Sequence, residues 1–162
     1  HDALAYYNTE RRLLISGDAL WRDGFGILFP EVLGSGDGIA GARRALEAIG
    51  RLAVDAVIPG HGAPFVEFDD AMARAFARLR AFEEDGARMA RNAIRACFTF
   101  GLLDMRSIAL ERLPDYLTTT PLYRDANARF LGLTPDALAQ WLVSELERAG
   151  VAERQGELLV AR

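Results

Sequence analysis

The sequence predicts an α/β fold over residues 1–65, followed by a mainly helical, winged-helix-like module over residues 66–162. Two patterns lead to this prediction. In the first segment, short apolar strands flank one amphipathic helix, and the strand after the helix ends in a glycine-rich loop, as is typical of layered α/β architectures. In the second segment, helical periods lead to a helix with a strong start signal and then to a terminal hairpin.

The first segment opens with two short runs of β-prone residues. Residues 4–7 and 13–15 are apolar, and the polar residues 8–11 between them have the length of a hairpin turn. Residues 19–38 are rich in glycine and aromatic side chains and predict a long structured loop. Such loops in compact domains often carry function.

A helix and a second kind of strand follow this loop. Residues 39–52 have the period of a helix, with Ala42, Leu46 and Ile49 on one face. Residues 54–58 are almost all apolar, which predicts a strand buried on both faces. The strand stops in Pro-Gly-His-Gly, and ligand sites of α/β folds gather on loops at strand ends.

The second segment begins with a helical pattern that starts at residue 69 and runs past residue 82, and Gly86 is expected to interrupt it before a further helical run over residues 89–100. Asp69 and Asp70 are expected to cap the first of these helices, because short acidic side chains accept hydrogen bonds from the free N–H groups of a helix start. Residues 118–127 predict an irregular connection.

The end of the chain carries the winged-helix-like pattern. Thr134 and Pro135 form a strong start signal for a helix that Gly150 stops, and residues 151–160 read as a hairpin. A winged helix suggests nucleic acid, but residues 66–162 hold 13 Arg against 15 Asp plus Glu, a net charge of −2. Phosphate contacts provide nearly all non-specific affinity, so no nucleic-acid partner is expected.

Composition limits the class of protein further. The chain is 51% hydrophobic and 26% charged, as in ordinary globular proteins, and its net charge of −4 does not favour nucleic acid or an anionic membrane. No apolar run approaches the length of a membrane span, so no membrane partner is expected. Cys97 is the only cysteine, which excludes an internal disulfide and favours a reducing, cytoplasmic setting. Its apolar surroundings indicate a packing role.

Two polar residues stand out at predicted strand ends. Asp18 follows an apolar strand and Gly17, and His61 lies between two glycines at the end of the next strand. A carboxylate and a neutral imidazole are favoured ligands of zinc and related divalent ions, so the pair is a candidate metal site. The alternative for Asp18 is a helix cap or a hydrogen-bonded turn residue.

The sequence segments around Asp18 and His61 resemble motifs of a known protein family. Leu-Leu-Ile-Ser-Gly-Asp-Ala-Leu at 13–20 and Val-Ile-Pro-Gly-His-Gly at 57–62 are similar to the last two metal-ligand motifs of the metallo-beta-lactamase superfamily. The resemblance covers residues 1–65 and implies the second half of an αββα sandwich. It implies that Asp18 bridges two divalent metal ions and that His61 ligates the second, both residues being catalytic. The ions are expected to be zinc, with iron or manganese as alternatives.

The sequence departs from the family pattern at its start. The superfamily's His-x-His-x-Asp-His motif is absent from the 162 residues, and the chain is expected to begin in mid-domain. His1 precedes Asp18 by about the spacing of a further ligand histidine, so it is either a third metal ligand or a terminal residue without a role. Without the missing ligands the isolated chain is expected to be inactive, and its open sheet face is expected to be covered by self-association or by the rest of a larger protein.

The function predicted from the resemblance is hydrolysis of a small-molecule substrate by metal-activated water. The bond cleaved belongs to an ester, thioester, lactone, amide or phosphodiester. Trp21, Phe25 and Phe29 are expected to line the substrate pocket, the alternative being that they pack their own loop. Glu31 is either an acid supporting the site or a solvated residue. The carboxyl-terminal module is expected to serve as a cap or a homodimer contact. The alternative function is a non-catalytic assembly module with relic metal motifs.

Overall fold

A computed structural model of the chain describes residues 4–162 and contains two compact units. The first unit holds the residues up to Glu31 together with Gly36–Asp85, and the second holds Val32–Ser35 together with Gly86–Arg162. Among the described residues, no helix is long and apolar enough to cross a lipid bilayer.

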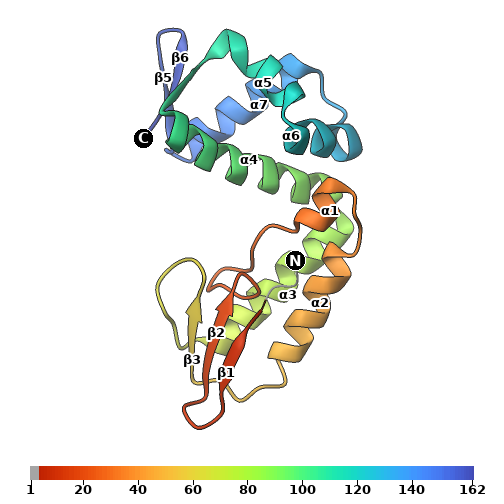
Figure 1. Cartoon of the computed structure of the whole chain (residues 1–162), viewed down its shortest axis with the longest axis vertical. Helices are drawn as coiled ribbons and strands as arrows, with labels where there is room; N and C mark the ends of the chain where they lie inside the picture. Colours follow the sequence, from red (N-terminus) through yellow and green to blue (C-terminus); the bar gives the residue numbers. More distant parts are fainter. Residues whose placement is uncertain (1–3) are drawn as a thin grey trace. The chain divides into compact units, whose positions relative to one another are not determined.

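The first unit is built on a three-stranded sheet with the order β1-β2-β3 (Figure 1). The expected hairpin is confirmed: β1 (Tyr6–Asn8) and β2 (Leu13–Gly17) pair antiparallel. β3 (Ala56–Pro59) pairs with β2 in parallel, as a strand must when a helix carries the chain back across the sheet.

Three helices belong to the first segment of the sequence or follow it directly. α2 (Gly38–Ile49) confirms the expected helix, whereas α1 (Phe29–Leu33) is a short helix inside the stretch predicted as loop. α3 (Phe68–Glu84) begins one residue before Asp69, so Asp69 and Asp70 lie in its first turn and are not its caps.

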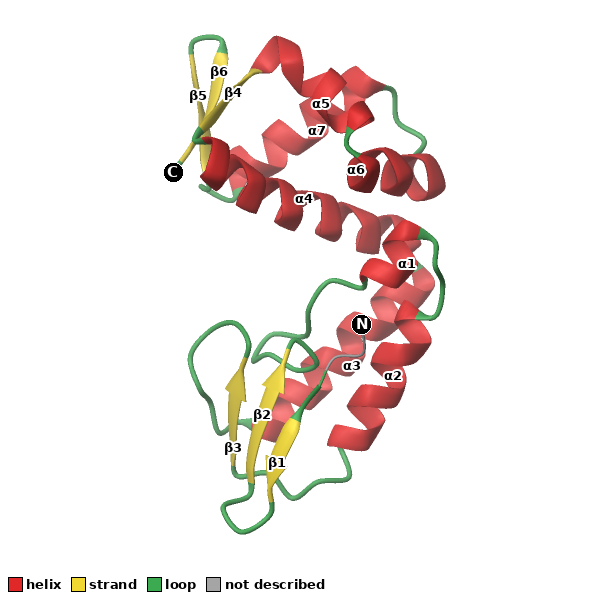
Figure 2. Ribbon diagram, in the orientation of Figure 1, coloured by secondary structure: helices red, strands yellow, loops and turns green. Residues whose placement is uncertain are grey.

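α3 also changes the boundary between the two parts. The sequence placed it in the second part, but α3 packs beside α2 and belongs to the first compact unit. Figure 2 shows both helices against the sheet of this unit. The reason is apolar burial: α3 contributes six buried residues, among them Leu79 and Phe82, and the Phe82 ring lies 6.0 Å from that of Phe25.

The sheet of the first unit has one buried and one exposed face. Leu14 and Val57 are buried side by side in the register of β2 and β3. On the opposite face the row Tyr6, Ile15 and Ile58 is exposed by 64%, 45% and 39%. The prediction that β3 is buried on both faces is therefore wrong for the described structure, because β3 is an edge strand with helices packed on only one side.

The second unit is mainly helical, with a small sheet in the order β4-β6-β5 in which both pairings are antiparallel. The expected terminal hairpin is present, and the strand that joins it was not predicted. The elements are α4 (Gly86–Met105), β4 (Ser107–Ala109), η1 (Leu110–Arg112), α5 (Leu113–Thr119), α6 (Pro121–Ala126), η2 (Asn127–Leu131), α7 (Pro135–Arg148), β5 (Ala152–Gln155) and β6 (Leu158–Ala161).

Local signals explain two of these helices. The hydroxyl of Thr134 accepts a hydrogen bond from the N–H of Ala137 at 3.3 Å, which confirms the expected start of α7. The prediction of an irregular connection over residues 118–127 is wrong, because most of that stretch is helical. Thr120 is extended, and Pro121 then starts α6 at a position where a helix needs no N–H from that residue.

An aromatic cluster lies in the core of the second unit. The Phe98 ring is 5.9 Å from that of Tyr116 and 6.0 Å from that of Tyr123. Tyr123 is buried, and that burial, with Tyr116 beside it, raises the pKa of its phenol above its ordinary value of 10.0. Burial also raises the pKa of the Cys97 thiol, which agrees with a packing role for that residue.

Candidate functional site

The parallel pairing of β2 and β3 brings the two predicted ligands together. Gly17 at the end of β2 is in register with Pro59 at the end of β3, so the residues that follow both strands emerge at the same edge of the sheet. The result is a distance of 3.7 Å between Oδ1 of Asp18 and Nε2 of His61. Residues 43 positions apart in the sequence thus form one site.

Glycines make this close approach possible. A Cβ at Gly60 would lie 2.9 Å from Oδ1 of Asp18, and a Cβ at Gly26 would lie 2.9 Å from Cβ of Asp18. The N–H of Gly60 donates to the carbonyl of Gly17 at 2.8 Å, and that of Gly26 donates to the carbonyl of Asp18, also at 2.8 Å. The backbone at Gly17 and Asp18 is therefore hydrogen-bonded on two sides, to Gly60 and to Gly26. These bonds fix the position of the Asp18 Cα, from which the side chain extends.

Trp21 contacts His61 directly. Its ring meets the imidazole of His61 edge to face, with centroids 5.1 Å apart and planes at 79°. The indole N–H donates to the carbonyl of Gly17 at 3.2 Å, which anchors the ring to the end of β2. The described contacts of Trp21 thus orient His61.

The Asp18 and His61 side chains are open to solvent, at 60% and 62% exposure. A carboxylate and an imidazole on adjacent strand ends fit a divalent metal ion by donor chemistry. Within residues 4–162, however, no group of three or more His, Cys, Asp or Glu side chains could hold a metal ion. His1, for which the sequence left open a third ligand or a terminal residue without a role, lies outside the described residues. Of the three candidate ligands, the described residues therefore include Asp18 and His61.

A cavity of about 470 Å³ adjoins Asp18. One wall is the loop after β2 and the other is the face of α2 that carries its smallest residues. The lining consists of Asp18, Ala19, Phe25, Gly26, Ile27, Leu28, Pro30, Gly36, Asp37, Gly38, Gly41, Ala42, Arg44 and Ala45.

The three aromatic residues expected in the substrate pocket take different positions. Phe25 lines the cavity with part of its surface but is itself buried, with the guanidinium carbon of Arg78 5.4 Å from its ring centre. Trp21 and Phe29 are not part of this lining, and Phe29 is exposed. Phe25 therefore does both things that the sequence left open: one face of its ring packs against its own unit, and the other lines the cavity.

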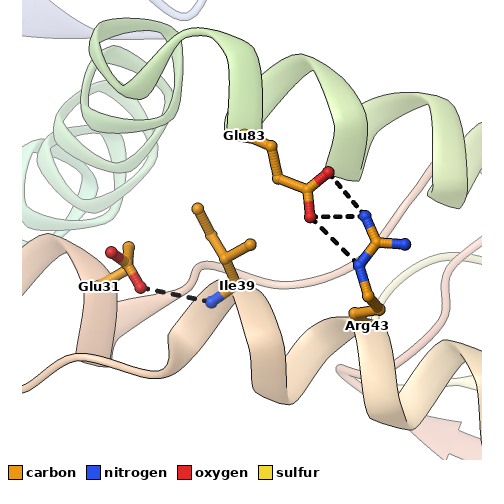
Figure 3. Close-up of polar contacts among 4 residues, drawn as sticks. All are labelled: Glu31, Ile39, Arg43 and Glu83. Carbon is orange, nitrogen blue, oxygen red and sulfur yellow. Dashed lines mark hydrogen bonds and ion pairs between the residues drawn. The ribbon is translucent and has the colours of Figure 1, made fainter.

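Two polar contacts hold the cavity walls and were not predicted. Figure 3 shows that a carboxylate oxygen of Glu31 accepts a hydrogen bond from the N–H of Ile39 at 3.4 Å, which satisfies one free donor at the start of α2. In the same view the guanidinium of Arg43 binds both carboxylate oxygens of Glu83, each at 2.6 Å, and so joins α2 to α3. The partners of these contacts are 8 and 40 positions apart in the sequence, so no local sequence pattern predicts them.

One ion pair lies at the edge of the cavity. Arg44 and Asp37 are 2.7 Å apart, and both side chains are largely exposed. The hydrogen bond from Arg44, with its positive charge, lowers the pKa of the Asp37 carboxyl below its ordinary value.

Comparisons with known proteins find weak structural similarity to metallo-beta-lactamase family proteins. No family model and no curated protein matches it. A metallo-beta-lactamase family protein from Thermus thermophilus is 17% identical with a TM-score of 0.36, covering 98% of this chain and 44% of that one. A beta-lactamase domain protein from Burkholderia ambifaria is 20% identical with a TM-score of 0.35, covering 98% and 42%. The chain spans less than half the length of each, and at these TM-scores neither likeness assigns a family or an activity.

Proposed function

We propose that this chain carries the last two ligand positions of a metal-dependent hydrolase of the metallo-beta-lactamase type. The observation that supports it is the 3.7 Å separation between Oδ1 of Asp18 and Nε2 of His61 at the ends of two adjacent parallel strands. Both residues lie in sequence segments that are similar to metal-ligand motifs of that superfamily. A solvent-open carboxylate and imidazole at this spacing suit two ligands of one divalent ion or of neighbouring ions.

The residues of the chain have distinct tasks in this proposal. When bound, divalent ions supply a Lewis acid and lower the pKa of a coordinated water. Asp18 would contribute the negative charge that balances such ions, and the absence of a Cβ at Gly26 and Gly60 leaves room for its side chain. His61 contributes a neutral nitrogen donor, and Trp21 holds its ring.

Metal content of the full-length protein tests the proposal. Asp18→Asn and His61→Ala should each lower the bound zinc measured by elemental analysis and reduce hydrolysis by roughly 100-fold or more, since loss of a metal ligand disables the activated water. The matched control is Asp23→Asn, a change at an 83% exposed carboxylate of the same loop. It should retain both metal and activity.

Two results would contradict the proposal. If Asp18→Asn and His61→Ala retain full metal content, these residues are not ligands. If the wild-type protein binds no zinc, iron or manganese, the alternative function holds. The chain is then a non-catalytic module whose ligand motifs no longer bind metal. Far-ultraviolet circular dichroism of each variant separates lost ligation from lost folding.

A further inference from the structure

The volume, lining and charge of the cavity beside Asp18 restrict the kind of molecule that it can bind. Its lining runs from Asp18 and Ala19, at the end of β2, to Asp37 and Arg44, at the start of α2. Its volume of about 470 Å³ lies in the range of small-molecule sites. The other lining residues are glycines or carry aliphatic or aromatic side chains.

The width of this cavity depends on small residues in α2. Besides Arg44, the residues that α2 contributes to the lining are Gly38, Gly41, Ala42 and Ala45, so over this part the helix presents backbone and methyl groups where longer side chains would fill the space. On the opposite wall lie Phe25, Ile27, Leu28 and Pro30. Two apolar walls with an open space between them suit a flexible carbon chain.

The walls are held in place before any ligand binds. A Cβ at Gly38 would lie 2.9 Å from the backbone nitrogen of Glu31, so the loop and the helix touch at this point. The hydrogen bond from Ile39 to Glu31 closes the same junction, and the Arg43–Glu83 pair fixes α2 to α3 (Figure 3). A preformed cavity binds an apolar group without the cost of ordering its own walls.

Charge in the cavity disfavours a phosphodiester. Asp18 and Asp37 contribute two carboxylates, and Arg44 is the one cation in the lining. The guanidinium of Arg44 is already paired with Asp37 at 2.7 Å. Apart from the proposed metal ligand Asp18, the lining therefore offers a phosphodiester no unpaired cation, whereas an uncharged carbon chain needs none.

We propose that the cavity between the loop of residues 25–30 and α2 binds the apolar acyl chain of an ester or thioester substrate. This inference rests on the proposed function, because Asp18 marks the reacting end. In the hydrolysis, the oxygen of water bonds to the acyl carbon and the bond from that carbon to the ester oxygen or thioester sulfur breaks. The products are the carboxylic acid and the alcohol or thiol, which between them receive the protons of water.

Binding of neutral amides to the 162-residue chain without added metal tests the cavity directly. Octanamide and acetamide carry no charge to be repelled by Asp18, and they differ only in chain length. In an NMR titration octanamide should shift the methyl signals of Ile27, Leu28 and Ala42 and bind roughly tenfold or more tightly than acetamide. Ala42→Phe should weaken octanamide binding by about tenfold or more, because the ring occupies the space between the walls.

The matched control is Ala48→Phe, on an exposed position of the same helix that is not part of the lining. It should leave octanamide binding unchanged. If Ala42→Phe does not fold, Ala42→Leu replaces it with a smaller increase in volume. In the full-length, metal-loaded protein, Ala42→Phe should also lower the ratio of kcat/KM for 4-nitrophenyl octanoate over acetate by about tenfold or more.

The inference is overturned if octanamide binds no tighter than acetamide, or if the substitutions at 42 and 48 have equal effects. It is also overturned if dimethyl phosphate shifts the same methyl signals more strongly than octanamide does, since the cavity would then select a phosphodiester. Amide binding needs no metal, so the two proposals can be judged separately. The amide titration tests the cavity alone, and the metal measurements on Asp18 and His61 test the metal site alone.

Discussion

Replacing Gly60 by alanine would add one methyl group at the most crowded point of the candidate site. The new Cβ would lie 2.9 Å from Oδ1 of Asp18, 2.9 Å from the carbonyl carbon of Gly17 and 3.0 Å from its oxygen. Ordinary contacts begin at 3.4 Å, and two of these atoms are backbone, so β2 and the Asp18 carboxylate must move by about 0.5 Å. Gly60 is not among the glycines with positive φ, so the effect comes from the clash alone.

Overpacking of this kind costs about 1–3 kcal/mol. Gly60→Ala should therefore lower the free energy of unfolding by that amount in a urea titration followed by circular dichroism. It should also weaken zinc binding in the full-length protein, because the Asp18 carboxylate is displaced relative to His61. The control is Gly41→Ala, where the nearest neighbour is 3.8 Å away in an α-helix and the methyl group should stabilise by about 0.4–1 kcal/mol. Unchanged stability and unchanged zinc affinity in Gly60→Ala would refute this account of the glycine.

The remaining predictions concern the two cores. Leu46→Ala removes a fully buried side chain of α2 and should lower the free energy of unfolding by about 2–5 kcal/mol, whereas Leu158→Ala at a 41% exposed position should cost far less in the same titration. Because the pKa of Tyr123 is raised in the folded chain, its stabilising contribution is complete below pH 10 and is lost as the pH rises further. Tyr123→Phe should thus reduce the loss of stability above pH 10, while Tyr6→Phe at an exposed position should not; equal alkaline profiles would contradict this assignment.

The residues of the candidate site could be named from the sequence because their signals are local. Asp18 follows an apolar strand and Gly17, and His61 follows an apolar strand and lies between Gly60 and Gly62; both motifs can be found without knowledge of the rest of the chain. The start of α7 at Thr134 and the period of α2 are equally local, since a cap acts over three residues and a helical face repeats every turn.

Other features depended on contacts that no local pattern encodes. Glu31 accepts from Ile39 and Glu83 pairs with Arg43 only after the loop, α2 and α3 have packed. The same packing places α3 in the first compact unit. Residues 118–127 have no clear helical pattern in the sequence, but in the structure Pro121 begins a second helix directly after the first.

By itself the sequence determined which residues are chemically suited to bind a metal and which strands lead to them. Only the tertiary structure decided that they meet, since the 3.7 Å distance between Asp18 and His61 requires the parallel register of β2 and β3. It also decided which loop residues face a cavity: Phe25 lines one, Trp21 orients His61, and Phe29 is exposed. The physical reason is that hydrophobic character makes all three aromatic residues suitable for burial, and only packing selects what each one contacts.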